Sequence, residues 1–573
     1  MKNPKTIIML FICMVFAGNL LSCSDETINE TPVEFFQVGF ISADSNKISQ
    51  YVNNLYTFLP TGYNRLGGNS MVASATDEAV HALKGVSEAE LWATGRWDAF
   101  NTRDNSFSNC YTGIRRSFIF EDQVLPLVES YTLTQAGKDQ FLGETLFLRA
   151  YFNFELLKRF GGYPLVKKTL STDEDLKIPR NTYDDCVAYI SDLCDSAANL
   201  LPLSYTASQF GRATKGAALA LKARMLLYAA SPLFNDSSKP NNDLEHGKYD
   251  PSKWEKAAEA AAAVINLKNT NGTAVYSLYT AGTGYDAFFN TLTSNNEIII
   301  SRMEPAGNTI ERLNGPVSIT GGEGGTCPSL DLVNDYEMAN GVPFDWNNPA
   351  QAQAPFANRD PRFAKSILYN GATWMLNVVI ETFDGGKDLV GNKATRTGFY
   401  LRKFLNANAR WNAPTGNTFH CFPLIRYGEV LLNYAEAMNE AYGPDADPKA
   451  YGMTARGAIQ LIRKRAGLTA NTDLSQNVST GDQNAMRTAI RHERRIELAF
   501  EEHRHLDVRR WKIAETVFNG PVSGLHIVKN SDNTYTYTTQ IAEKHIFTSR
   551  MYLYPFPQSE ISRNPNLVQN TGW

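Results

Sequence analysis

Apolar residues recur at the spacing of an α-helix along much of the chain. The repeat is clearest at Leu142, Leu146, Ala150 and Phe154, which stand four residues apart. A four-residue step places side chains on one face of a helix, and Gly161 marks the point where this helix is expected to stop. The pattern predicts a long helix with one face buried against a neighbour.

Helical spacing returns in several further segments that are separated by glycine or proline. Consecutive helices joined by short breaks pack as antiparallel pairs. Pairs of about 34 to 40 residues with aromatic and small residues at their contacts resemble degenerate tetratricopeptide hairpins. The predicted fold class is therefore mostly α, a scaffold of helix pairs with a rigid face. The expected helices run from Thr182 to Leu201, from Thr214 to Pro232, from Trp254 to Leu267, from Arg426 to Gly443, around Ile459 and Ile462, and from Asn484 to Lys512.

The helical pattern fades between residues 269 and 422. Glycine, asparagine, threonine and proline become frequent there, and short β-like runs such as Glu297 to Ile300 replace longer periodic segments. We expect a loop-rich region with short strands, and we expect ligand contacts in its loops, because loops carry many binding residues. The glycine-rich run from Gly321 to Gly325 is expected to be a flexible surface loop.

The first residues have the order of a bacterial export signal. Lys2 and Lys5 precede an uncharged, mostly apolar run at 6–18, which is too short to span a bilayer. Cys23 follows Leu-Leu-Ser, which resembles a lipobox, so Cys23 is the expected lipidation site and acyl chains would hold the mature chain on a membrane. The alternative is an ordinary signal peptide with a cysteine near its end. The expected organisation is a lipoprotein signal peptide at 1–22, a flexible lipid-anchored tether at 23–33, a helical N-terminal region at 34–268 and a C-terminal region at 269–573 that includes the loop-rich segment.

Charge and cysteine content narrow the possible partners. Without the signal the formal charge changes from −4 to −6, because Lys2 and Lys5 are the signal's only charged residues. A chain with no basic surplus is not expected to bind nucleic acid. The seven cysteines show neither a disulfide framework nor metal-type spacing. Cys186 and Cys194 lie about 12 Å apart on one predicted helix, too far for a disulfide, and are expected to be buried.

A series of short motifs with charged and aromatic residues runs along the whole chain. In chain order they are Thr76-Asp77-Glu78-Ala79, Arg149-Ala150-Tyr151, Arg159 to Pro164, Gly211 to Ala218, Asp360-Pro361-Arg362-Phe363, Arg426-Tyr427, Arg494 to Glu497, Arg509-Arg510-Trp511, Tyr554 to Pro557, Asn564-Pro565 and Asn570. Together, in this order, they resemble the SusD/RagB family, the surface lipoproteins of starch-utilisation-type import systems.

The resemblance implies a mostly helical SusD-like body with tetratricopeptide-like pairs on one side. It also implies a non-catalytic protein on the exterior of the outer membrane, which delivers captured ligand to a SusC-like TonB-dependent barrel. Family members bind oligosaccharides, and some bind peptides, so the resemblance leaves the ligand open. Two pairs of charged residues in the motifs, Arg426 with Glu436 and Arg495 with Glu502, are expected to lock helix ends and loops.

Aromatic side chains outside helices are the first candidates for contact with a sugar. Aromatic rings stack on the apolar C–H faces of sugars, while polar groups bond to the hydroxyls. Residues 92–98 resemble the tryptophan-glycine-tryptophan loop that carries ligand contacts in some family members. The alternative is that these rings belong to the core. The candidate ligand-binding residues are Trp92, Arg96, Trp97, Tyr285, Trp374 and Trp411.

Signatures of metal catalysis and cofactor binding are missing from the sequence. His492-Glu493 begins a zincin motif, but Ile496 stands where the second histidine must be. His503 and His505, two residues apart on a predicted helix, cannot share a metal in the usual way and are expected to cap or solvate that helix. No phosphate-binding loop or serine-hydrolase elbow occurs. We expect no metal and no cofactor.

Asp77 and Glu78 are adjacent carboxylates, and a pair of carboxylates is the usual equipment of a glycosidase. Neighbouring side chains usually point apart, and in the family this position fixes a loop, so we expect a structural or polar-binding role. The predicted function is the capture of oligosaccharides for import. Capture of peptides by the same fold, an exported glycosidase and a pure docking scaffold are the alternatives.

Overall fold

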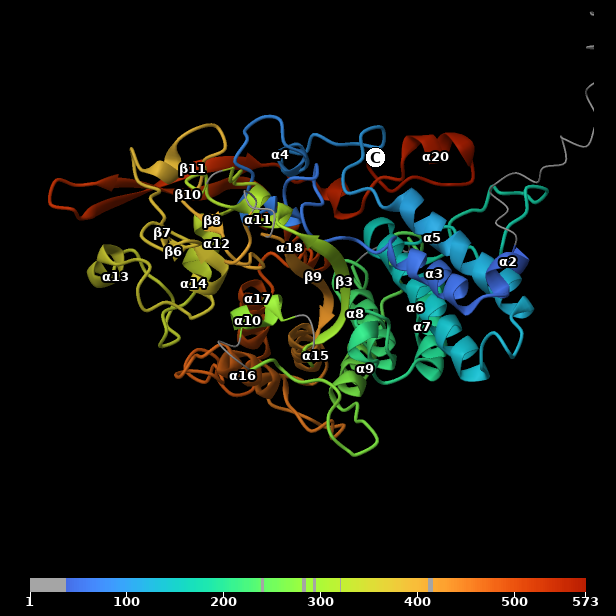
Figure 1. The fold of residues 1–573 in the computed structure, drawn as a ribbon. Coiled ribbons are helices and arrows are strands. Elements are labelled where there is room, and N and C mark those ends of the chain that lie inside the picture. Colours follow the sequence, from blue (N-terminus) through green and yellow to red (C-terminus); the bar gives the residue numbers. More distant parts are fainter. Residues whose placement is uncertain (1–37, 239–241, 281–284, 292–294, 320, 411–415) are drawn as a thin grey trace, which may run out of the picture.

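The computed structural model of the protein describes residues 38–238, 242–280, 285–291, 295–319, 321–410 and 416–573 (Figure 1). The expected signal, tether and lipidated Cys23 lie outside these ranges. Helices provide most of the regular structure and the strands are short, which confirms the mostly α fold. Within the described ranges, every helix is too short or too polar to cross a membrane.

Helix pairs form the right and lower parts of the body in Figure 1, and the predicted pairs are confirmed. Thr182 and Thr214 cap two of these helices, because each side-chain oxygen accepts a hydrogen bond from a backbone N–H three residues later. Small side chains let α8 (Lys215–Ala230) approach α9 (Lys253–Ile265) closely, and Ala218 and Ala258 on these two helices are fully buried. The paired helices are α6 (Gln135–Phe160), α7 (Tyr183–Leu200), α8 (Lys215–Ala230), α9 (Lys253–Ile265), α15 (Tyr427–Tyr442), α16 (Ala455–Arg465) and α17 (Gln483–Glu497).

The single helix predicted for residues 484–512 is wrong. The chain forms α17, then a turn, and then α18 (Arg504–Arg510). Phe500 and Glu502 lie in the turn with left-handed φ angles of 65° and 63°, which a continuous right-handed helix does not allow. The sequence pattern missed the break because no glycine or proline marks it.

Further helices, most of them short, complete the described part of the chain. They are α2 (Val38–Ser42), α3 (Ser45–Tyr56), α4 (Glu88–Ala93), α5 (Phe107–Ile119), α10 (Tyr285–Asn290), α11 (Thr309–Asn314), α12 (Leu330–Asp335), α13 (Pro349–Gln353), α14 (Phe363–Ser366), α19 (Ala514–Val517) and α20 (Gln558–Arg563). The largest core cluster extends from Leu55 to Leu567, so it runs through both regions into which we divided the sequence.

The strands form small antiparallel sheets. The pairs are β3 (Ile298–Gly307) with β9 (Thr418–Arg426), β5 (Ile367–Leu368) with β8 (Tyr400–Leu401), β6 (Thr373–Trp374) with β7 (Val378–Val379), and β10 (Gly520–Lys529) with β11 (Tyr535–His545), while β1 (Ala75–Thr76), β2 (Ala79–Val80) and β4 (Cys327–Pro328) form a three-stranded sheet. The β10–β11 hairpin projects at the upper left of Figure 1.

The glycine-rich run at 321–325 is packed against the body, which corrects the expected flexible loop. A Cβ atom on Gly322 would lie 2.0 Å from the carbonyl oxygen of Pro316, and one on Gly325 would lie 2.0 Å from that of Asn69. These glycines are therefore required for close backbone packing.

A buried ion cluster joins the helix pairs to the strands. We use this name for Arg362, Lys403, Arg426, Arg465, Glu297, Glu493, Glu497 and Glu501, whose side chains are at most 2% exposed. Arg426 lies at its centre and contacts Glu297 at 2.7 Å, Glu497 at 2.8 Å and Glu501 at 2.7 Å. Hydrogen bonds between full charges are strong in such a dry site, so the cluster fixes the turn after α17.

Both ion pairs predicted from the sequence are wrong, because Arg426 does not pair with Glu436 and Arg495 does not pair with Glu502. The four residues nevertheless connect segments far apart in the chain, which no sequence spacing predicts. The observed pairs include Arg510–Glu436 at 2.5 Å, Arg495–Asp335 at 2.6 Å and Arg65–Glu502 at 3.0 Å.

Asp77 and Glu78 are buried, in line with the structural role expected for them. Asp77 accepts hydrogen bonds from Arg504 at 2.8 and 2.9 Å. Burial, followed by the negative charge of Asp77, raises the pKa of Glu78 from 4.5 to about 8. This arrangement is largely closed to a substrate, because both residues are less than a tenth exposed.

His503 and His505 are buried as well, so the prediction that they solvate the helix is wrong, and His503 stands at the N-cap of α18 without a capping hydrogen bond from its side chain. His505 forms a hydrogen bond of 2.7 Å with the Tyr554 hydroxyl. Burial, followed by nearby arginines, lowers the pKa of both imidazoles well below 6.5. Cys186 and Cys194 are buried, as expected.

Candidate ligand-binding site

Trp92 and Trp97 lie in the core, each 4% exposed. Their rings meet edge to face at 6.5 Å, and both pack against the ring of Tyr554 at 6.0 and 5.6 Å. The terminal residue Trp573 covers Trp97 at 4.6 Å. A ring enclosed in this way has no free face for a sugar, so its place in the structure favours the alternative that it belongs to the core.

The other predicted aromatic residues lie apart from this cluster. Tyr285 is 3% exposed, and its hydroxyl donates to the carbonyl oxygen of Glu497 at 3.1 Å. Trp374 is 7% exposed and lies under the guanidinium of Arg402, 5.1 Å from its ring centre. Trp411 lies outside the described residues. The structure therefore brings Trp92 and Trp97 together in the core, whereas Tyr285 and Trp374 fill separate gaps elsewhere.

Arg96 is the predicted residue that lies at the surface, with half of its side chain exposed. It faces Glu90, whose carboxylate lies 3.8 Å from the Arg96 guanidinium and 3.6 Å from that of Arg396. The same carboxylate accepts a hydrogen bond of 2.5 Å from the backbone N–H of Gly85. Glu90 therefore joins the Arg96 loop to the wall of a nearby pocket.

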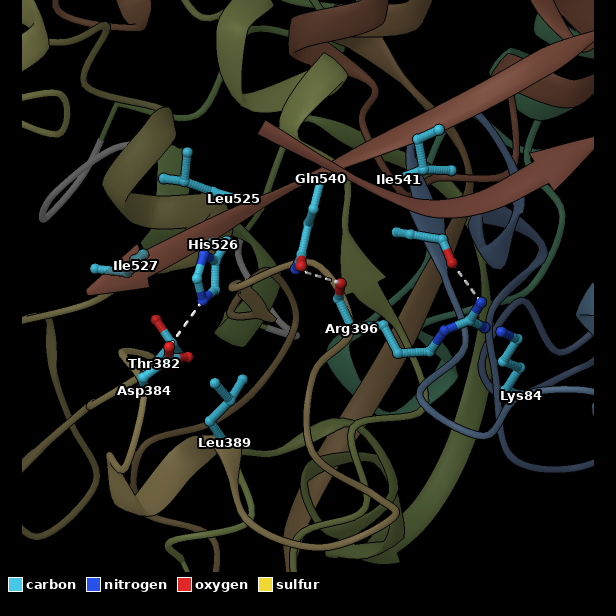
Figure 2. Close-up of a pocket in the computed structure, with 11 residues that line it drawn as sticks. Lys84, Thr382, Asp384, Leu389, Arg396, Leu525, His526, Ile527, Gln540 and Ile541 are labelled. Atoms are coloured by element: carbon cyan, nitrogen blue, oxygen red, sulfur yellow. Dashed lines mark hydrogen bonds and ion pairs between the residues drawn. The ribbon is translucent and has the colours of Figure 1, made fainter. Parts of the chain in front are cut away.

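This pocket opens between the β10–β11 hairpin and the loop at 382–396, with Lys84 at one end (Figure 2). Its volume of about 370 Å³ lies in the range of small-ligand sites. The lining residues are Lys84, Thr382, Asp384, Leu389, Arg396, Leu525, His526, Ile527, Gln540, Ile541 and Ala542. Three segments distant in sequence thus form one open, mixed polar and aliphatic site.

Two glycines allow the hairpin to approach the loop closely. Gly398 has a φ of 84°, and a Cβ atom there would lie 2.6 Å from the carbonyl oxygen of Leu525. A Cβ atom on Gly524 would lie 2.8 Å from the Cα of Thr397. The backbone N–H of Leu525 then donates to the carbonyl oxygen of Thr397 at 2.8 Å. This backbone contact fixes the hairpin against the loop at Leu525, which lines the pocket.

Arg396 is held inside the wall rather than presented to solvent. It contacts Glu543 at 3.1 Å and donates to the carbonyl oxygen of His81 at 3.2 Å. Burial, followed by the charge of Arg396, lowers the pKa of His81 to about 4, so this imidazole is neutral at physiological pH. Its Nδ1 accepts a hydrogen bond of 2.9 Å from the backbone N–H of Leu83, which positions the segment that carries Lys84.

Several polar groups of the pocket retain capacity for a ligand. Lys84 is exposed and makes no hydrogen bond or ion pair with the other residues drawn in Figure 2. The Thr382 hydroxyl is buried without a hydrogen-bond partner among the described residues. His526 pairs with Asp384 at 2.9 Å, yet their side chains remain 38% and 53% exposed. Because the Thr382 hydroxyl is closed to solvent, the capacity available to a ligand lies with the exposed side chains of Lys84, His526 and Asp384.

Phe100 is an exposed aromatic residue that sequence reasoning missed. It lies in the Arg96 loop and is 79% exposed. The Asp98 carboxylate accepts hydrogen bonds of 2.8 Å from the backbone N–H groups of Phe100 and Asn101, which hold the turn. An aspartate such as Asp98 favours such a turn, but the sequence hypothesis named tryptophan and tyrosine rings and no phenylalanine.

Comparison with known proteins places the chain in a family. The SusD family model matches residues 294–573, and a model described as starch-binding associating with outer membrane matches residues 30–227. The chain belongs to the SusD family. SusD-like protein P25 of Formosa agariphila is 23% identical to it over 98% of both chains. SusD-like protein P2 of the same organism is 36% identical over 147 residues, which make up 26% of this chain and 24% of that relative.

The fold of this SusD-family chain is also found in solved structures. The crystal structure of a SusD-like protein from Bacteroides fragilis superposes with a TM-score of 0.76 at 27% identity, over 93% of this chain and 98% of that one. Separately, the description of the family model that matches residues 30–227 associates the chain with the outer membrane and with carbohydrate.

Proposed function

We propose that this chain is a non-catalytic outer-membrane lipoprotein that binds oligosaccharides and passes them to a SusC-like TonB-dependent barrel. The observation that carries the proposal is the open pocket of Figure 2, where cationic, amide and hydroxyl groups surround aliphatic side chains. Sugars present both hydroxyls and apolar C–H faces, so they need this mixture. The family's association with starch binding supports it.

Each group of the pocket has a role in this proposal. Lys84, His526 and Gln540 bond to sugar hydroxyls, while Leu389 and Ile541 contact C–H faces. Arg96 and Phe100 extend the contact surface along the neighbouring loop, with Phe100 as the stacking ring. The pocket residues, Arg96 and Phe100 are therefore to be tested before the tryptophans that the sequence analysis named.

Binding without catalysis fits the charge of the pocket. Glycosidases normally use two carboxyl groups, and Asp384 is the one carboxylate among the lining residues that the structure describes. We therefore expect no release of reducing ends from any glycan that the protein binds. Release above buffer that disappears in Asp384→Asn would favour the glycosidase alternative.

The test is affinity electrophoresis of residues 24–573 in gels that contain starch, laminarin, xylan, pectin or chondroitin sulfate. We expect retardation by one class, and Lys84→Ala with His526→Ala should weaken it about tenfold, the cost of losing a hydrogen bond to a charged group. Lys544→Ala, on the exposed side of the same hairpin, is the matched control and should change nothing. Retardation that the double variant leaves intact would remove the pocket from the proposal.

The membrane part of the proposal rests on Cys23 and the family. Lipidation of Cys23 and the tether at 23–33 would leave the body, with its regions 34–268 and 269–573, free to face the exterior. Cys23→Ala should abolish labelling by palmitate and release the protein from the membrane fraction. Copurification of a TonB-dependent barrel with the lipidated protein tests the partner.

Peptide capture is the second candidate, and one observation favours it. In the described part of the chain β11 pairs with β10 alone, so its other edge is open to an extended peptide. A peptide added there would bond through its main chain. A casein digest that raises the melting temperature, together with no retardation by any polysaccharide, would favour this function.

A further inference from the structure

A second cavity lies on the helical side of the molecule, at the meeting point of four helix ends. It is formed where α8 and α15 end and α9 and α17 begin, and its volume is about 730 Å³. Figure 1 shows α9 and α15 in the lower part of the molecule, whereas β10 and β11 lie at the upper left. The two cavities share no lining residue.

Two aromatic side chains line this second cavity. Tyr249 is 55% exposed and Trp254, in the first turn of α9, is half-buried. The segment between them is clamped, because Asn235 donates to the carbonyl oxygen of Asp250 at 2.9 Å and accepts from its N–H at 2.8 Å. The rings therefore stand on a fixed turn rather than on a loose loop, which lowers the entropy lost on binding.

A planar ion pair forms another wall. Arg487 contacts Glu440 through two parallel hydrogen bonds of 2.6 and 2.5 Å. Gln483 lies beside this pair and donates to the carbonyl oxygens of Asn439 and Glu440, at 2.5 and 3.2 Å. This wall offers fixed polar groups to a ligand at no cost of ordering them.

The charges of the cavity nearly cancel. Arg487 neutralises Glu440, and Lys512 contacts Asp236 at 2.8 Å. Glu255 is left as a half-exposed carboxylate, with its nearest cation 3.9 Å away. An anionic ligand gains nothing here, whereas a neutral ligand rich in hydroxyls finds acceptors, donors and two rings.

We propose that this cavity is a second carbohydrate site, which holds a neutral saccharide unit against Trp254 and Tyr249. Glu255, Gln483 and the Arg487–Glu440 pair bond to its hydroxyls. The inference rests on the proposed function, since it adds a separate contact for a glycan-binding chain. A polysaccharide long enough to meet both cavities binds more tightly than either site alone allows.

The experiment is fluorine NMR of residues 24–573 labelled with 5-fluorotryptophan. The first pocket contains no tryptophan among its lining residues, so the Trp254 resonance, assigned by its loss in Trp254→Phe, reports on the second cavity. The probes are the neutral oligosaccharides maltohexaose, laminarihexaose, xylohexaose and mannohexaose, with oligogalacturonate as the anionic comparison. We expect one neutral hexaose to shift this resonance in a saturable way, and oligogalacturonate to leave it unmoved.

The variant Tyr249→Ala should weaken that titration at least fivefold and leave the other tryptophan resonances in place. Tyr131→Ala is the matched control, because Tyr131 is 85% exposed and lines neither cavity. A Trp254 resonance that stays still while glycans are retarded through the first pocket overturns the second site alone. A saturable shift with no effect of the Lys84 and His526 variants on retardation supports the second site and overturns the first. No shift and no retardation overturn both.

Discussion

Charged residues fill two regions of this protein with opposite consequences. In the buried ion cluster around Arg426, opposite charges lie within 3.0 Å of one another and the side chains are at most 2% exposed. In the pocket of Figure 2, Lys84 is exposed and bonds to none of the residues drawn, and Asp384 keeps 53% of its side chain in solvent. Exposure and spare hydrogen-bonding capacity, rather than residue type, separate charges that hold the fold from charges that can meet a ligand.

The largest expected effect is on the buried side of this comparison. Arg426→Ala leaves Glu297, Glu497 and Glu501 without their central cation, and removal of one partner from a buried pair costs about 3–5 kcal/mol. Urea unfolding should show this loss, or the variant should fail to fold. Lys84→Ala, the exposed control, should change the free energy of unfolding by less than about 0.5 kcal/mol. A loss below about 1 kcal/mol for Arg426→Ala would mean that the cluster is dispensable.

The same contrast applies to the aromatic residues. Trp92→Ala removes a buried ring and should cost about 3–5 kcal/mol of stability. We expect the fraction that remains folded to bind glycan like the wild type, because the ring does not reach solvent. Thermal unfolding together with binding measured below the transition separates the two effects. A stable Trp92→Ala protein that no longer binds would make Trp92 a ligand contact after all.

An intermediate effect concerns Glu78, a buried carboxyl close to the charges of Asp77, Arg495 and Arg504. Its pKa is raised from 4.5 to about 8, so the folded protein keeps the proton while the unfolded chain loses it. The stability that Glu78 contributes is full below pH 4.5 and is lost as the pH rises toward about 8, because the folded state must then ionise a buried group. The melting temperature should fall over this window, and Glu78→Gln should flatten the fall. Parallel curves for the two proteins would contradict the assignment.

The helix pairs could be predicted from the sequence because they depend on local information. The four-residue repeat of α6 and the capping threonines Thr182 and Thr214 act within a few residues, and both are where the pattern places them. The turn after α17 was not predicted, because the contact that causes it, between Glu501 and Arg426, joins residues 75 positions apart.

The candidate site could not be predicted for the same reason, because it also depends on contacts between residues far apart in the chain. Trp92 is covered by His505 and Tyr554, more than 400 positions away, so no local pattern could distinguish it from an exposed ring. The pocket is built from residue 84, the loop at 382–396 and the hairpin at 525–542, which meet only in the folded chain. Arg96, which the sequence analysis named as a ligand-binding candidate, has half of its side chain exposed, as is usual for a long charged side chain.

The smallest expected effect on stability concerns Phe100, an exposed aromatic residue at the surface. Phe100→Ala should leave the free energy of unfolding within about 0.5 kcal/mol of the wild type, because the ring is 79% exposed and the turn is held by Asp98 through backbone N–H groups that the substitution retains. If the ring stacks on a sugar, binding should weaken about fivefold, close to the 1 kcal/mol that an exposed aromatic contact contributes. Val86→Ala, another exposed apolar substitution, is the control. Equal binding by the two variants would confine the ligand to the pocket and leave Phe100 as an exposed ring without a role in capture.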